Sequence, residues 1–445
     1  MPEIASSPAS TLTPAKTARQ RTDTFTSIWM IIAVAMAIVT LVVKNRMPQP
    51  LWTMIHLVTL GVLSNGIFQW SWFFARSLAR LPADDSRARR HNTIRILIFN
   101  ACFLLLFVSM WLGWMVGTMI AATGIAAVAA WHGAEMLSVL RERLASRFVI
   151  VVRYYVCSAS FFVLAALLAS FVSATMFSPS IPEAMVAMRD RLTLAHALSG
   201  VAGWVGLTIG GTVITLGPTI LRTRMSPDAV SGGVRVLLPW CLSLLLAIAG
   251  ALLGVMPLVG AGILAVGTCA IVGIVYPYAK VLRNKGPREY SAWSFLLGLL
   301  WISVGVCALG VASLFVSTPS QLRALTLMWL PIIGIAGFAQ LFQGALSYLM
   351  PVVIGGGPSV VRIGIAIIDW QYSLRLGLRN SALILELFLF FTSEIPSVHV
   401  LRMAGWLLVI ATFVIDVVIY AKTGVTQARA RRARSETLSE SRQVQ

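Results

Sequence analysis

Long apolar segments dominate the sequence and constrain its fold more than any other feature. We place twelve of them between the charged residues, near 27–43, 52–75, 96–114, 116–139, 149–174, 192–220, 236–254, 256–279, 291–316, 324–350, 377–393 and 400–420. A helix needs about 20 apolar residues to cross the hydrocarbon core of a bilayer. Only 11% of the residues are charged and 58% are hydrophobic. These values exclude a soluble enzyme and a disulfide scaffold, and they predict an all-α polytopic membrane helix bundle.

The basic residues indicate how such a bundle is oriented. If the N-terminus is inside, all but six of the 35 basic residues lie in inner segments, the exceptions being Lys44, Arg46, Arg189, Arg191, Arg323 and Arg402. Cytoplasmic loops carry the excess of Lys and Arg in membrane proteins. We therefore expect about twelve spans with both termini in the cytoplasm. The net charge of +19 then reflects orientation and not nucleic-acid binding. The Arg- and Ala-rich usage suggests a bacterial chain, hence a bacterial plasma membrane.

Three regions follow from this reading. Residues 1–25 are rich in Ser, Thr, Pro and Ala and are expected to form a disordered cytoplasmic tail, not a signal peptide. Residues 26–421 form the twelve-span domain, in which 359–376 are interpreted as an interfacial helix. Residues 422–445 are basic and then polar, and are expected to form a second disordered cytoplasmic tail that lies against anionic lipid.

Two of the five histidines are candidate metal ligands. His56 and His196 each lie near the outer end of a segment that runs inward, so their imidazoles are expected at similar depth. Such a pair could ligate one haem b or one copper ion. The alternative is two separate hydrogen-bonded histidines near the interface. His91 lies in a basic loop and is expected to be solvated, and the five cysteines lie singly in apolar runs, without a CxxC pair.

Three segments carry a resemblance to a known family. They are HLVTLGVLSNGIFQWSWFFARSLARLP from His56 to Pro82, AHALSGVAGWVGLTIGGTVITLGPTILRTRM from Ala195 to Met225, and GFAQLFQGALSYLMPVVIGGGP from Gly337 to Pro358. Together they resemble bacterial membrane proteins related to the membrane half of fused copper-oxidase or nitrite-reductase-like proteins. More distantly, they resemble haem–copper oxidase subunit I, nitric oxide reductase and NnrS-type haem proteins. The resemblance implies a haem–copper-oxidase-like helix arrangement, with His56 and His196 at ligand positions.

The sequence also departs from that family. Leu198 and Gly200 stand where the family pattern has a second histidine and an asparagine, and Phe73 replaces a histidine after the first motif. The segments 236–254 and 324–350 contain no histidine. The remaining histidines could support one haem or one loosely held copper at most. Oxygen or nitric oxide reduction at a binuclear centre is therefore not expected.

Other polar and small residues inside the apolar segments allow two interpretations each. His196, Gly203, Gly210 and Gly217 follow a seven-residue spacing, which predicts a close-packed helix face or a flat wall against a planar cofactor. Gln340 and Gln343 are interpreted as amides that join helices, although Gln340 lies where the family places haem ligands. The run from Gly355 to Pro358 is interpreted as a turn.

Buried carboxylates are few, and each requires an explanation in a bilayer. Glu135 follows His132 by one helical turn, so we expect a local hydrogen-bonded pair. Glu386 is the deepest acid and is interpreted as a proton-relay group, a substrate counter-ion, or the partner of a donor on a neighbouring helix. Asp416 is expected near the inner end of the last span.

Three functions agree with these features. The first is a membrane protein of the oxidase-like superfamily with a reduced ligand set, which binds one haem or copper in a redox or nitrogen-oxide-related role. The second is a secondary transporter. The third is a cofactor-less membrane partner or scaffold for a redox protein.

Overall fold

The computed structural model describes residues 18–43, 48–82, 84–143, 149–177, 182–224, 227–284, 286–390 and 396–443. Over these ranges the chain forms α-helices and short π-helices, with no strand. It divides into two compact units, one of Met1–Arg189 with Ser199–Ile209 and one of Asp190–Leu198 with Gly210–Gln445.

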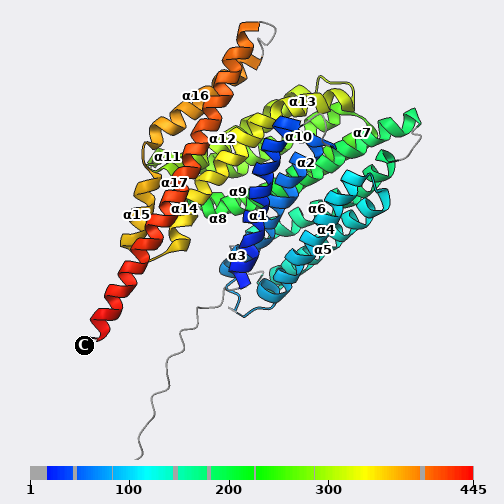
Figure 1. Ribbon diagram of the computed structural model, residues 1–445. Helices are drawn as coiled ribbons and strands as arrows, with labels where there is room; N and C mark the ends of the chain where they lie inside the picture. The colour runs from blue at the N-terminus through cyan, green and yellow to red at the C-terminus, as the bar shows by residue number, and fades with distance from the viewer. Residues whose placement is uncertain are drawn as a thin grey trace, which may run out of the picture. The chain divides into compact units, whose positions relative to one another are not determined.

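The first unit is built from long antiparallel helices and shorter helical pieces. In Figure 1, α4, α5 and α6 lie side by side in this unit. Its helices are α1 (Ala18–Val43), α2 (Pro50–His56), the π-helix η2 (Leu57–Ser64), α3 (Asn65–Leu78), the π-helix η3 (Arg87–His91), α4 (Asn92–Leu112), α5 (Met115–Glu142) and α6 (Val149–Met176). The chain then continues through α7 (Glu183–Ala197), the π-helix η4 (Leu198–Gly206) and α8 (Leu207–Ile220), whose residues are divided between the two units.

The second unit contains the remaining helices. In it, α16 packs along α17, as Figure 1 shows. The helices are α9 (Pro227–Leu253), α10 (Met256–Ala270), the π-helix η5 (Ile271–Val275), α11 (Tyr276–Asn284), α12 (Tyr290–Ser313), α13 (Pro319–Pro331), the π-helix η6 (Ile332–Ala339), α14 (Gln340–Ile354), α15 (Pro358–Ile368), α16 (Tyr372–Phe390) and α17 (Pro396–Gln443).

Ten helices of the described chain are long and apolar enough to cross a membrane. They match ten of the twelve expected segments, which confirms an all-α, multi-pass membrane architecture. The expected segment 27–43 lies in α1, whose apolar part is the shorter Phe25–Thr40. The expected segment 377–393 overlaps α16, which also carries Arg375, Arg379 and Glu386.

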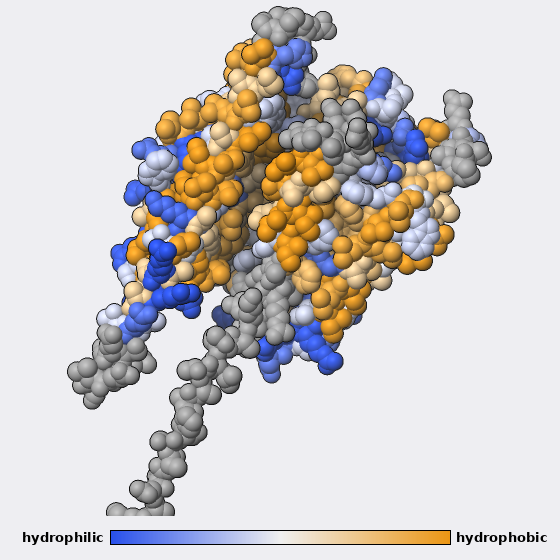
Figure 2. Space-filling model, viewed as in Figure 1, coloured by the Kyte–Doolittle hydropathy of each residue, from blue (hydrophilic) through white to orange (hydrophobic). Residues whose placement is uncertain are grey.

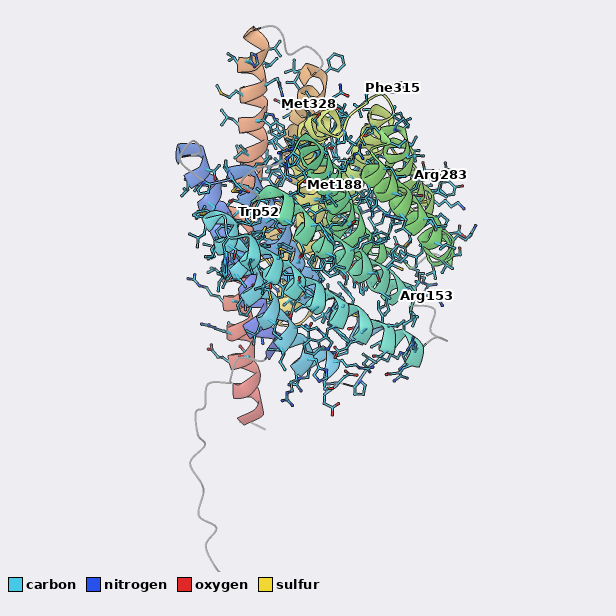
Figure 3. The ribbon with its side chains drawn as sticks, turned by 90° about the vertical axis from the view of Figure 1, so that its right-hand side faces the viewer. Trp52, Arg153, Met188, Arg283, Phe315 and Met328 are labelled. Atoms are coloured by element: carbon cyan, nitrogen blue, oxygen red, sulfur yellow. The ribbon has the colours of Figure 1, made fainter. Side chains whose placement is uncertain are left out.

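The surface of these helices is apolar, as expected for contact with lipid. Figure 2 shows hydrophobic side chains along the sides of the helices and hydrophilic ones gathered toward their ends. Phe315 and Met328, labelled in Figure 3, are 82% and 51% exposed. Large apolar side chains at such exposure are rare in contiguous patches on soluble proteins, and a bilayer provides their natural environment.

Two expected boundaries differ from the structure. The segment 359–376 is not one interfacial helix, because α15 ends at Ile368 and a turn with Gln371 at φ 48° precedes α16. The expected tail at 422–445 is helical up to Gln443, as a direct continuation of α17. The expected tail at 1–25 lies outside the described residues up to residue 17, and its last part belongs to α1.

The part of α17 beyond its apolar residues is held by contacts with the end of α14 and with the glycine turn between α14 and α15. Gly355, Gly356 and Gly357 all have positive φ and form the turn expected there. Gln427 Nε2 donates to the Pro351 carbonyl at 2.7 Å, and Arg431 donates to the Ile354 carbonyl at 2.8 Å. The extension thus satisfies carbonyls at the end of α14, which an α-helix leaves without partners.

Three long π-helical segments were not expected from the sequence. They are η2, η4 and η6, of eight or nine residues each. Two of them, η2 and η4, lie inside segments that carry the family resemblance, and η6 overlaps the start of the third such segment. Longer π-helical runs are rare, and short ones occur frequently at functional sites. Within the first unit, Trp204 Nε1 of η4 donates to Ser64 Oγ at the end of η2, at 3.0 Å.

Candidate functional site

His56 ends α2 and precedes η2 directly. Its Nδ1 lies 2.9 Å from the carbonyl oxygen of Trp52, and the two rings stack with centroids 4.3 Å apart (Trp52 is labelled in Figure 3). A carbonyl can only accept, so Nδ1 carries the hydrogen and Nε2 is the basic nitrogen of the neutral ring. Metal-binding histidines are commonly oriented by such a bond to a backbone carbonyl.

His196 occupies the corresponding place before η4, near the end of α7. It is half-buried, like His56. His56 belongs to the first unit and His196 to the second. Both histidines therefore lie at the junction between an α-helix and a π-helix.

His132 is the fully buried histidine of the first unit. Its Nε2 lies 3.4 Å from Ser71 Oγ of α3, and its ring meets Phe68 edge-on at 4.9 Å. Trp72 and Trp204 complete an aromatic enclosure, with ring centroids 6.2 and 6.1 Å from the imidazole. Aromatic rings from α3 and the π-helix η4 thus surround this histidine of α5.

Glu135 binds other partners than the expected one. Its carboxylate accepts from Trp131 Nε1 at 2.9 Å and from His91 Nδ1 at 2.6 Å, and it forms an ion pair with Arg95. The expected pair of His132 with Glu135 is therefore wrong, and His91 is not simply solvated. The physical reason is Arg95, which is fully buried in α4 and requires a counter-charge.

Arg95 is also held by aromatic rings. Its Cζ lies 5.1 Å from the centroid of the Trp72 ring and 5.3 Å from that of Trp131. Stacking on indole faces favours a guanidinium that is withdrawn from water. The sequence gave no clear signal that Arg95 is buried, because this residue was counted with the basic residues of an inner segment. In the structure, Arg95 Nη2 donates to Oδ1 of Asn92, three residues earlier, at 3.3 Å.

A second buried charged cluster lies in the second unit. Arg375 and Arg379 of α16 both form ion pairs with Asp416 of α17, and the side chains of Arg379 and Asp416 have no exposed surface. Tyr290 Oη of α12 donates to Asp416 Oδ2 at 2.6 Å. Arg379 also donates to Gln343 Oε1 of α14 at 2.8 Å. Side chains from four helices therefore gather around one carboxylate.

The remaining N–H groups of these two arginines donate hydrogen bonds to other nearby acceptors. Arg375 Nε donates to the carbonyl of Trp370, just after α15, at 3.0 Å, and Arg379 Nε donates to Thr412 Oγ1 at 3.0 Å. Asp369 accepts the Tyr290 backbone N–H at 2.8 Å, and burial raises the pKa of this carboxyl above its ordinary value. Removing one partner of such a buried ion pair destabilises a protein strongly, and buried ionisable groups in membrane proteins are candidates for proton relays.

The sequence missed this cluster because both arginines were counted with the basic residues of an inner segment. Arg375 lies in the expected interfacial helix 359–376, and Arg379 lies at the start of the expected span 377–393. Their spacing of four residues, with apolar residues between, could have indicated one helix face. Asp416, an acid inside the last expected span, could have indicated the partner. Only the fold brings the two helices together.

Gln340 joins helices, as expected. Its amide exchanges two hydrogen bonds with Asn380 of α16, at 3.2 and 3.1 Å, and Trp301 Nε1 donates to Asn380 Oδ1 at 2.8 Å. Gln343 also joins helices, through Arg379 and Tyr290. Both amides are thus used in helix–helix contacts.

Glu386 has a donor on a neighbouring helix, which is one of the three interpretations that the sequence allowed. Arg402 Nε of α17 lies 3.4 Å from Glu386 Oε2, and the Glu386 side chain is 2% exposed. Gly405 makes room for the carboxylate, because a Cβ there would lie 2.5 Å from Oε1. Arg402 is 29% exposed, so this pair lies nearer to solvent than the Asp416 cluster.

The glycine row at 203, 210 and 217 packs against three different partners. A Cβ would meet Phe161 at Gly203, Trp240 at Gly210 and the Tyr278 hydroxyl at Gly217. The close-packing interpretation of each glycine is therefore confirmed. Because the three partners differ, the row does not form one face against a single neighbouring helix.

Among the described residues, no three His, Cys, Asp or Glu side chains lie together as a metal site of three ligands would require. One or two imidazoles suffice for a haem iron. In comparisons with known proteins, no family model matches the sequence and no curated protein is significantly similar to it.

Proposed function

We propose that this multi-pass membrane protein binds one haem, with copper as the alternative metal. His56 is the candidate ligand in the first unit, and His196 is the candidate ligand in the second. In this proposal the chain has an oxidase-like helix arrangement with a reduced ligand set. It acts in electron transfer or in sensing a diatomic nitrogen oxide, together with a redox partner protein, in a bacterial plasma membrane.

The observation that carries the proposal is the bond from His56 Nδ1 to the Trp52 carbonyl. It leaves Nε2 as the basic nitrogen, which is the atom that would bind iron, and it holds the ring against rotation. The stacked Trp52 ring adds a second restraint. His196 is supported by its matching position before η4.

Haem iron supplies one-electron chemistry and a coordination position for a diatomic molecule. The protein would contribute the imidazoles, their orientation and an apolar surrounding. Such surroundings tune the potential of an iron and limit the access of water.

The test uses protein purified from cells supplied with haem precursor. Haem and copper content per chain are measured for the wild type and for His56→Ala, His196→Ala and His399→Ala. His399 is the matched control, because it is another histidine near the outer side. The proposal expects a Soret band in the wild type and in His399→Ala, and its loss in His56→Ala, in His196→Ala, or in each of them. If His56→Ala and His196→Ala retain the wild-type content of haem or copper, these histidines are not the ligands. If the wild type contains neither cofactor, the cofactor-less partner becomes the better account.

A second candidate is a proton-linked transporter, favoured by the charged groups buried in the second unit. Glu386 and Asp416 are both at most 2% exposed. Proteoliposomes that contain a pH-sensitive dye and are driven by a potassium diffusion potential would test it. A proton flux that is lost in Glu386→Gln would favour the transporter, and absence of flux above empty liposomes would exclude proton-driven transport.

A further inference from the structure

Three buried nitrogens in the first unit have neither a hydrogen-bond partner nor an ion-pair partner among the residues that the structure describes. They are Trp72 Nε1, Arg95 Nε and His132 Nδ1. All three side chains are at most 1% exposed. Buried polar groups are rarely left without a partner, because each orphan costs free energy.

The three groups share one neighbourhood. The Arg95 guanidinium and the His132 imidazole both lie against the Trp72 ring, at 5.1 and 6.2 Å from its centroid. They come from α3, α4 and α5, which all belong to the first unit. Other nitrogens of Arg95 and His132 have partners: Arg95 Nη2 donates to the Arg87 carbonyl at 3.0 Å, and His132 Nε2 lies by Ser71.

The chemistry of the three atoms is complementary to one kind of molecule. Trp72 Nε1 and Arg95 Nε can only donate. His132 Nδ1 accepts when Nε2 carries the hydrogen and donates it to Ser71 Oγ. Two donors and one acceptor match a water molecule, which accepts two hydrogen bonds and donates two. An anion is disfavoured, because Glu135 already neutralises Arg95.

A polar chain leads from the surface of the first unit to these groups. The His91 side chain is 39% exposed and Glu135 is 13% exposed, whereas Arg95 is not exposed at all. The contacts from His91 to Glu135 and from Glu135 to Arg95 thus connect a partly exposed imidazole to the buried guanidinium.

We propose that Trp72 Nε1, Arg95 Nε and His132 Nδ1 form an internal binding site for one water-sized, neutral hydrogen-bonding molecule. This molecule connects the buried His132 imidazole to the polar chain that ends at His91. The proposal is independent of any haem or copper.

The experiment detects transfer of magnetisation from water to tryptophan indole protons by NMR, in the full chain labelled with ¹⁵N-tryptophan. The Trp72 signal is the one missing in Trp72→Phe. The matched control is Trp29, whose Nε1 donates to Asn100 Oδ1 at 2.6 Å and therefore needs no other partner. The proposal expects transfer to the Trp72 indole and none to that of Trp29. It also expects the Trp72 transfer to fall in His132→Phe, which removes the acceptor.

If Trp72→Phe does not fold, the Trp72 signal is assigned as the indole peak that shifts in both Ser71→Ala and His132→Gln. Absence of transfer to the Trp72 indole in the folded wild type would overturn the proposal. Equal transfer to Trp72 and Trp29 would overturn it as well, because it would reflect general access of water to buried indoles.

Discussion

Arg379 and Asp416 form an ion pair in which neither side chain has any surface accessible to solvent. The pair joins α16 to α17, and Arg375 adds a second positive charge to the same carboxylate. Two guanidiniums therefore depend on one acid, and the acid is the critical member of the cluster.

Asp416→Asn is expected to destabilise the protein more than Arg379→Gln. The first change leaves two buried guanidiniums without a counter-charge, whereas the second leaves the Arg375–Asp416 pair intact. Breaking a buried pair from one side costs about 3–5 kcal/mol. Thermal unfolding in detergent checks the order of the two midpoints. Lys280→Gln is the control, because Lys280 pairs with Asp228 at the surface and should change the midpoint little. Equal midpoints for the two buried variants would contradict this account.

Glu386→Gln is expected to leave the fold intact, because an amide retains the shape and one acceptor toward Arg402. The double variant Glu386→Leu with Arg402→Met is expected to be neutral or stabilising, as replacements of buried pairs by apolar residues often are. Two quantities are measured for each variant: the midpoint of thermal unfolding, and the proton flux in proteoliposomes relative to the wild type. A functional Glu386 requires that Glu386→Gln lowers activity at unchanged stability. If Glu386→Leu raises stability and changes nothing else, the residue is dispensable.

Two glycines in helices should respond in opposite ways to alanine. At Gly217 a Cβ would overlap the Tyr278 hydroxyl, which donates to the Val213 carbonyl at 2.5 Å. Gly217→Ala must displace that ring and is expected to lower the unfolding midpoint. At Gly66 nothing lies within 4 Å of the position that a methyl group would take, so Gly66→Ala should be neutral or stabilise by up to about 1 kcal/mol. A stable Gly217→Ala protein with the Tyr278 contact unchanged is not compatible with this packing.

The bundle could be predicted from the sequence because apolar length and charge are local properties. The buried pairs could not, because Arg95 with Glu135 and Arg379 with Asp416 depend on which helices become neighbours. Counting Arg95 and Arg379 with the basic residues of the inner segments gave no reason to expect a buried acidic partner for either. The π-helices were missed for a different reason. Segments such as Leu57–Ser64 are apolar all round, so their side chains carry no periodicity that distinguishes a π-helix from an α-helix.

The topology gives a further prediction. Reporter fusions are expected to be cytoplasmic after five positions and external after three, because basic residues concentrate inside. The cytoplasmic positions are Arg90, Arg147, Arg224, Lys285 and Arg432, and the external ones are Pro48, Ser180 and Ser320. An external signal at Arg224 would mean that the number of spans before it is wrong, and that His56 and His196 do not lie at similar depth.

The most direct test of the proposed function is the reduced-minus-oxidised absorption spectrum of the purified wild-type protein, with metal analysis of the same sample. Haem binding predicts a Soret band with α and β bands on reduction, and about one iron per chain for a haem held by one or two imidazoles. A protein that is folded, as judged by a cooperative unfolding transition, and that shows neither these bands nor bound copper would contradict the account.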